Sequence, residues 1–167
     1  FVLQVLEECG KKGIKVVIII SAGFAELNKK GKELQDKLKL VAEKYNLRLV
    51  GPNCLGIIRP ASSLNASFAP AMPPQGKIAF ISQSGALADS IIDWAIEERY
   101  GFSTIISYGN MADLDVCDFL RLLEKDKETS VITLYIEGLK DGLEFIEVAK
   151  RVSKKKPIIA LKAGKTD

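Results

Sequence analysis

A run of small and polar residues, Ser82-Gln83-Ser84-Gly85, separates an apolar segment from an amphipathic one. We predict a buried strand before it, at 77–82, and a helix after it, at 86–100. The first N–H groups of a helix lack partners and lie at the positive end of its dipole, so they attract anions. Gly85 leaves room for close approach, and the serine hydroxyls are further donors. The run therefore predicts a phosphate or carboxylate site, with the Ser84 and Gly85 N–H groups facing an open pocket.

Two other interpretations of this run differ in how well the sequence supports them. Ser is a favoured N-cap that stabilises a helix by about 1 kcal/mol, so a purely structural role for the serines stays open. A nucleophile elbow needs the pattern Gly-x-Ser-x-Gly, which this run lacks. The chain has no histidine, which excludes a Ser-His-Asp hydrolase or a zinc-binding histidine for this polypeptide. No metal site is predicted.

Chemically useful residues also follow the other expected strands. Glu137 comes directly after the apolar run VITLYI, and the ligand of such a sheet lies beyond the carboxyl ends of its strands. Asn110 follows the expected strand at 102–107, and Asn53 ends the one at 47–53. Each is interpreted either as a turn former or as a contact on the substrate side. The stretch 162–166 follows the last strand and is rich in small and charged residues. Turns favour Gly, Ser and Asn, which explains part of this pattern. This preference explains the presence of Glu137 less well.

The elements that position these residues alternate along the chain. Short apolar runs separated by amphipathic segments indicate an α/β fold with parallel sheets covered on both faces. We expect strands at 15–21, 47–53, 77–82, 102–107, 130–137 and 157–162, and helices at 27–46, 86–100, 115–123 and 143–153. Asp113 or Asp115 is the candidate N-cap of the helix at 115–123.

One segment interrupts this alternation. Residues 54–75 are rich in Pro, Ser and Asn, which favours a loop-rich crossing between two domains. We expect the domains to span 1–70 and 71–167. Cys54, at the start of this segment, is interpreted as a small buried apolar residue and not as a nucleophile.

Composition narrows the classes of function. The 24 basic and 21 acidic residues give a net charge of +3. The basic residues form no stripe with aromatic residues between them, so nucleic acid is not the expected partner. No apolar run approaches the roughly 20 residues of a membrane span, so no membrane association is expected. Three separated cysteines favour a reducing, cytoplasmic compartment. Frequent lysines and loop prolines hint at a heat-tolerant source.

At this point a series of motifs carries a resemblance. In order along the chain they read SAGFAE, GPNCLGI, LNASFAP, GKIAFISQSGALADSIIDWA, GFSTIISYGNMADLDVCDFL, LYIEGLKDG and KKPIIALKAGKTD. Together they resemble the NDP-forming acyl-CoA synthetases: ADP-forming acetyl-CoA synthetase alpha subunits, kin to the alpha subunit of succinyl-CoA synthetase. The resemblance covers essentially the whole chain.

The resemblance implies a fold and a chemistry. The first domain would be the C-terminal part of a Rossmann-like, coenzyme A-binding domain, and the second a flavodoxin-like ligase domain. The reaction would interconvert acyl-CoA, ADP and phosphate with a carboxylic acid, coenzyme A and ATP, through an acyl phosphate and a phosphohistidine. By the same resemblance, Ser82, Gln83, Ser84 and Gly85 bind the phosphoryl group and Glu137 orients the histidine.

Several parts of this scheme are expected outside the chain. The histidine would follow Asp167, and ATP or ADP with Mg²⁺ would bind an ATP-grasp beta subunit or fused domain. The full protein is expected to be an oligomer, and this piece alone to be inactive. Two alternatives stay open: a non-catalytic module that binds coenzyme A or acyl phosphate, and a protein acetyltransferase carrying these domains. The sequence leaves undecided the acyl group and the choice between ADP and GDP.

Overall fold

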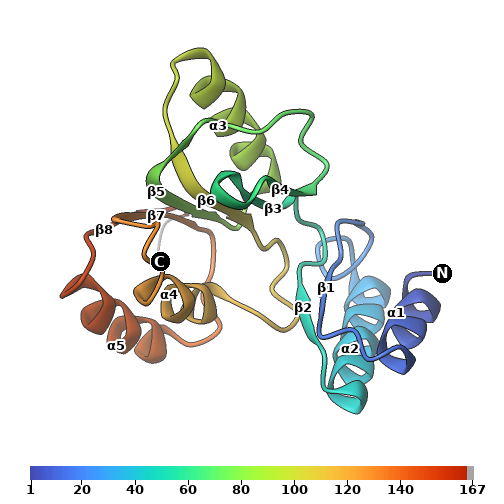
Figure 1. The fold of residues 1–167 in the computed structure, drawn as a ribbon. Helices are drawn as coiled ribbons and strands as arrows, with labels where there is room; N and C mark the ends of the chain where they lie inside the picture. Colours follow the sequence, from blue (N-terminus) through green and yellow to red (C-terminus); the bar gives the residue numbers. More distant parts are fainter. Residues whose placement is uncertain (165–167) are drawn as a thin grey trace.

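The computed structural model describes residues 1–164 (Figure 1). The first unit contains the helices α1 (Val2–Lys11) and α2 (Lys29–Tyr45). It also contains the strands β1 (Val16–Ile18) and β2 (Arg48–Val50), which pair in parallel with Val17 opposite Leu49. Figure 1 shows the two helices beside this short sheet.

One face of α2 is apolar and packs in this unit. Leu38 and Ala42 are buried, and Leu34, Val41 and Tyr45 are partly buried against the same cluster. The helix begins at Asn28, whose side chain accepts a hydrogen bond from the Gly31 N–H, as an N-cap does. The amphipathic helix expected at 27–46 is therefore confirmed, with its apolar stripe facing the core of this unit.

The second unit is built on a sheet of six strands. Its parallel part comprises β5 (Gln75–Ser82), β6 (Phe102–Ser107), β7 (Val131–Ile136) and β8 (Ile158–Lys162). These strands lie in the order β6-β5-β7-β8, the flavodoxin-like order. Since β6 and β7 flank β5 on opposite sides, the winding reverses at β5, where a ligand site is expected.

Helices cover both faces of this sheet (Figure 1). The helix α3 (Gly85–Glu97) lies on one face, and α4 (Val116–Glu124) and α5 (Gly142–Ser153) lie on the other. Alternate residues of β5 serve the two cores: Phe80 packs on the α3 side, whereas Ala79 and Ile81 pack on the opposite side. Asp115 is the N-cap of α4, which selects between the two predicted candidates.

The segment expected to be a loop-rich crossing contains regular structure, so that expectation was wrong for residues 56–67. There, β3 (Gly56–Arg59) and β4 (Leu64–Ser67) pair antiparallel around the 3₁₀ turn η1 (Pro60–Ser62). The hairpin joins the six-stranded sheet through β3, which pairs antiparallel with β6. Strands of four residues carry a weak sequence signal, and β4 also contains Asn and Ser, so sheet pairing decides the structure of this segment.

The loop after β6 forms hydrogen bonds that hold the second unit against the first. The N–H groups of Asn110, Ala112 and Leu114 donate to the carbonyls of Pro52, Gly51 and Leu49. Asp113 accepts from the Arg48 guanidinium at 2.9 and 3.1 Å and from the Leu49 N–H at 2.8 Å. Asp113, the other N-cap candidate, therefore joins the units instead of capping α4.

Candidate functional site

The predicted anion turn and Glu137 lie at one edge of the parallel sheet. The strands β5 and β7 are hydrogen-bonded neighbours, with Ser82 opposite Tyr135. Neighbouring strands lie about 4.8 Å apart, so the residues that follow them share the same edge. The expected placement of Ser84 and Glu137 on neighbouring strands is confirmed. Of the stretch that follows β8, Lys165 and Thr166 lie outside the described residues.

Gln83 joins these two strand ends directly. Its side-chain Oε1 accepts hydrogen bonds from the N–H groups of Glu137 at 2.8 Å and Gly138 at 2.9 Å. Its own N–H donates to the Tyr135 carbonyl at 3.1 Å. Gln83 therefore holds the backbone that carries the Glu137 carboxylate.

The hydroxyls of the turn are engaged within the turn itself. The Ser82 side chain is fully buried; its hydroxyl donates to the Ser84 carbonyl and accepts from the Ser84 N–H at 3.1 Å. The Ser84 hydroxyl caps α3 by accepting from the Leu87 N–H at 3.2 Å. The expectation of a free Ser84 N–H was therefore wrong, because a buried hydroxyl next to it needs a partner.

The N–H groups that remain open to an anion are those of the first residues of α3. Within residues 1–164, the N–H groups of Gly85 and Ala86 form no hydrogen bond, as expected for the first turn of a helix. Both residues line a cavity of about 570 Å³ together with Gln83, Ser84 and Glu137. An anion in this cavity could accept from two N–H groups and lie at the positive end of the α3 dipole.

The cavity has walls from both units. Ile20 and Ala22 come from the loop after β1, Asn53 and Leu55 from the connection between units, and Phe68 from the end of β4. Across the described residues the exposed Glu137 carboxylate has no ion-pair partner. It is therefore free to meet a cationic or hydrogen-bonding group that enters the cavity.

Asn53 and Asn110, both candidates on the substrate side, contact each other at the junction of the units. The Asn53 amide donates to the Asn110 side-chain oxygen at 3.2 Å. The Asn110 amide donates to Gln35 at 3.0 Å and to Glu26. Asn53 has a positive φ of 58°, which Asn tolerates better than most residues. Asn110 thus ties a loop of the second unit to the first.

Glu26 is a residue of this junction that the sequence analysis did not single out, although it ends the motif SAGFAE. Its carboxylate accepts from the Gly23 N–H at 2.6 Å and the Phe24 N–H at 3.1 Å. Desolvation acts to raise the pKa of Glu26, but hydrogen bonds from Asn110 and these N–H groups outweigh it and lower the pKa. An ionised Glu26 therefore holds the loop after β1 beside the cavity.

Cys54 and Tyr108 are buried next to the site. Burial raises the pKa of the Cys54 thiol to about 11, so this residue is a protonated, buried side chain as expected. The Tyr108 hydroxyl is also buried and has no hydrogen-bond partner within residues 1–164. Burial, then the carboxylates of Asp115 and Glu137, raise the pKa of Tyr108, which keeps the phenol neutral.

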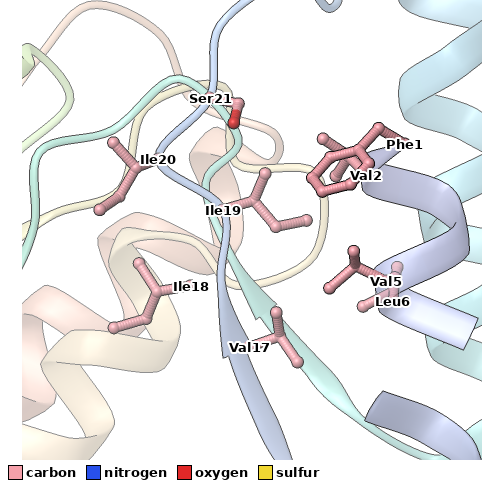
Figure 2. Close-up of a pocket in the computed structure, with 9 residues that line it drawn as sticks. All are labelled: Phe1, Val2, Val5, Leu6, Val17, Ile18, Ile19, Ile20 and Ser21. Atoms are coloured by element: carbon pink, nitrogen blue, oxygen red, sulfur yellow. The ribbon is translucent and has the colours of Figure 1, made fainter. Parts of the chain in front are cut away.

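A second pocket, of about 300 Å³, lies in the first unit (Figure 2). Figure 2 shows Phe1 and, from α1, Val5 and Leu6 on one side and Val17 and Ile19 on the other. The described residues that line it carry no charge, and the hydroxyl of Ser21 lies at one end. This pocket suits apolar groups, so we place the candidate chemistry in the cavity beside α3.

Within residues 1–164, no group of three or more Cys, Asp or Glu side chains could hold a metal ion. No helix in that range is long and apolar enough to cross a membrane.

Two family models match the chain. Residues 75–167 match the succinyl-CoA ligase like flavodoxin domain, and residues 1–60 match a CoA binding domain. The limits of the two domains at residues 70 and 71 stay a prediction, since the β3–β4 hairpin precedes that limit yet pairs with the second sheet.

Similar proteins cover essentially the whole chain. The alpha subunit of ADP-forming acetate–CoA ligase II from Pyrococcus furiosus is 53% identical over 167 residues, which are 100% of this chain and 36% of that subunit. A crystal structure of a Pyrococcus horikoshii OT3 protein matches with a TM-score of 0.96 and 51% identity, covering 99% of this chain and 38% of that one.

A third similar protein is described with ligands. It is the dinucleotide-forming acetyl-coenzyme A synthetase 1 of Ca. Korarchaeum cryptofilum, in complex with phosphate and ADP. Its TM-score is 0.94 at 44% identity, and the match covers 99% of this chain and 36% of that one. The chain therefore spans about a third of the length of these relatives.

Proposed function

The chain belongs to the NDP-forming acyl-CoA synthetase family, through its succinyl-CoA ligase like flavodoxin domain, and on that premise we propose that it forms part of such an enzyme. The enzyme converts a carboxylic acid, coenzyme A and ATP into acyl-CoA, ADP and phosphate, and it also runs in reverse. One observation carries the proposal: Gln83 holds the Glu137 backbone beside the free N–H groups of α3, in a single cavity.

The proposed chemistry assigns a role to each side of that cavity. The N–H groups of Gly85 and Ala86 bind the transferred phosphoryl group, since preorganised donors stabilise its charge. Glu137 orients a histidine and stabilises its cationic form, as carboxylates do for other functional histidines. Ser82, Gln83 and Ser84 shape the turn, and Asn53 and Asn110 lie on the coenzyme A side.

The remaining parts belong to other segments of the complete protein. The chain has no histidine and spans 36% of the P. furiosus alpha subunit, so we place the phosphorylated histidine in a segment outside it. ATP or ADP with Mg²⁺ binds an ATP-grasp domain or subunit, and the complete protein is an oligomer. The well-separated free cysteines favour a reducing cytoplasm.

The experiment uses the complete protein with its ATP-grasp partner. Incubation with acetate, coenzyme A and ATP should form acetyl-CoA and ADP in equal amounts. Incubation with ATP labelled at the γ-phosphate, without acid and coenzyme A, should leave an acid-labile label on the protein. Binding of coenzyme A without product or label would contradict the proposal and favour a non-catalytic module. Transfer of acetyl groups to lysines of other proteins would favour an acetyltransferase.

A further inference from the structure

The cavity beside α3 is lined by two chemically different kinds of group. Gly85, Ala86 and Glu137 contribute N–H donors and a carboxylate. Ile20, Leu55 and Phe68 contribute apolar surface to the same cavity. A ligand that fills this space needs a short apolar group attached to an anionic or strongly polar one, because each part then meets a wall of its own kind.

Among these three apolar side chains, Phe68 has the most exposed surface to bury when such a ligand binds. It is 62% exposed, whereas Leu55 in the same wall is 1% exposed. A large exposed aromatic residue that lines a cavity next to anion-binding N–H groups gains apolar contact only when that cavity is filled. Leu55 is already packed in the protein core, so it contributes a fixed surface.

The backbone around Phe68 is held firmly. The Phe68 N–H donates to the Leu55 carbonyl at 3.2 Å. On the next residue, the Ala69 N–H donates to the Ser67 hydroxyl at 3.1 Å, and the Asn65 amide donates to the Ala69 carbonyl at 3.2 Å. These bonds fix the chain on both sides of Phe68, so its ring is presented to the cavity by a preorganised turn.

We propose that Phe68 contacts the acyl group of the substrate and limits its size. This inference rests on the proposed function and names a residue that sets its specificity. The ring lines the same cavity as the Gly85 and Ala86 N–H groups, so a ligand whose polar end binds those groups brings its acyl chain to the ring. Asp89 and Glu137 also line the cavity, and their carboxylates disfavour an acyl chain that ends in a second carboxylate.

The test compares acids of increasing chain length in the complete enzyme. We expect Phe68→Ala to raise the ratio of kcat/KM for hexanoate to that for acetate by at least ~10-fold, since one methylene in an apolar pocket discriminates by this order. Phe68→Trp should lower the same ratio, and Phe68→Leu should raise it less than alanine does. If alanine removes all activity, the leucine and tryptophan variants still give the ratio.

The control lies in the same hairpin. Leu64 is 44% exposed and is not among the residues that line the cavity, so Leu64→Ala should leave the ratio unchanged. An active parent whose ratio is the same in all three Phe68 variants overturns the inference and leaves the proposed function standing. A parent that forms no acyl-CoA with any acid overturns the proposed function, and the inference with it.

Discussion

Gln83 holds the backbone of Glu137: its carboxamide oxygen accepts from the Glu137 N–H at 2.8 Å and from the Gly138 N–H at 2.9 Å. Gln83 lies in the turn before α3, and Glu137 follows the neighbouring strand β7. The bond therefore fixes the separation between the anion-binding turn and the carboxylate. A substitution in the anion-binding turn should therefore also displace the Glu137 carboxylate, and a change at the end of β7 should also displace the turn.

The first prediction concerns this bond. Gln83→Leu keeps the size of the side chain but leaves two N–H groups without an acceptor, which costs about 1 to 3 kcal/mol where they are shielded from water. We expect a lower free energy of unfolding, by about 1 kcal/mol because the site is partly open to solvent, and slower histidine phosphorylation in the complete enzyme. Denaturant unfolding and rapid-quench labelling measure the two effects.

Gln83→Glu is the matched comparison, because a carboxylate still accepts from both N–H groups. It should retain the stability while weakening anion binding through its added charge. If the leucine and glutamate variants had the same free energy of unfolding and the same rate of histidine phosphorylation, the role assigned to Gln83 would be contradicted.

The second prediction concerns Glu137 itself. Its side chain is exposed, so Glu137→Gln should leave folding and the unfolding midpoint unchanged. In the complete enzyme it should slow phosphohistidine formation at least ~10-fold, because neutral glutamine stabilises an imidazolium less than a carboxylate does. Single-turnover labelling with γ-labelled ATP measures the rate. Wild-type rates in the glutamine variant would exclude this role.

The third prediction separates capping from anion binding in the α3 turn. Ser84→Ala removes the N-cap acceptor of the Leu87 N–H and should cost about 1 kcal/mol of stability. Phosphate binding should change little, because the donors are the Gly85 and Ala86 N–H groups. Thermal unfolding with and without phosphate measures both quantities.

Gly85→Ala, in contrast, should weaken phosphate binding. Its Cβ would lie 3.3 Å from the Leu55 nitrogen and would also narrow the approach of an anion to the N–H groups. We expect phosphate to stabilise this variant much less than the parent. A complete loss of phosphate binding in Ser84→Ala, without loss of stability, would instead make the hydroxyl a direct ligand.

The fourth prediction concerns stability at acid pH. The Arg59 guanidinium, which donates to Asp126 at 2.7 and 3.2 Å, lowers the Asp126 pKa from 3.8 to about 2. Since the folded pKa is below the unfolded one, the stabilisation is present above pH 3.8 and is lost as the pH falls through about 2. The shift corresponds to roughly 2 kcal/mol. This pair fastens the β3–β4 hairpin to the loop after α4.

Asp126→Asn should therefore lower the free energy of unfolding by roughly 2 kcal/mol at pH 7, and the difference from the parent should vanish only below about pH 2. Asp36→Asn is the control, because Asp36 forms an exposed pair with Lys32 whose loss should cost less than about 0.5 kcal/mol. Urea unfolding across this pH range gives the comparison. A pH-independent difference would mean that packing, and not the charge of Asp126, stabilises the hairpin.

The fifth prediction concerns the chain by itself. With no histidine among its 167 residues, it lacks the nucleophile of the proposed mechanism. Mixing the purified chain with acetate, coenzyme A and ATP should form no acetyl-CoA above background. The complete protein with its ATP-grasp partner is the positive control. Turnover by the purified chain, once contaminating synthetases are excluded, would contradict the mechanism.

Much of the fold could be predicted from the sequence because it depends on local properties. Continuous apolar runs and the 3.6-residue pattern placed β6 at 102–107 and the buried face of α2, where Leu38 and Ala42 pack. Strand-to-helix turns follow from short-range chemistry, so the Ser-Gln-Ser-Gly run could be recognised as the start of a helix with an N-cap. The same alternation predicted parallel strands covered on both faces, whereas the flavodoxin-like domain was implied by the resemblance and not by the residue pattern.

Other features depend on residues far apart in the chain, and no local pattern encodes them. The Gln83–Glu137 bond joins residues 54 positions apart, and the Asn110–Glu26 bond joins residues 84 apart. The weakly patterned hairpin at 56–67 became a pair of strands because β6 offered an open edge. The Ser84 N–H was taken by a buried Ser82 hydroxyl, since a polar group shielded from water needs a partner. Sequence periodicity thus determined which segments are strands and helices, whereas the packing of distant segments decided which polar groups are satisfied and which stay open to a ligand.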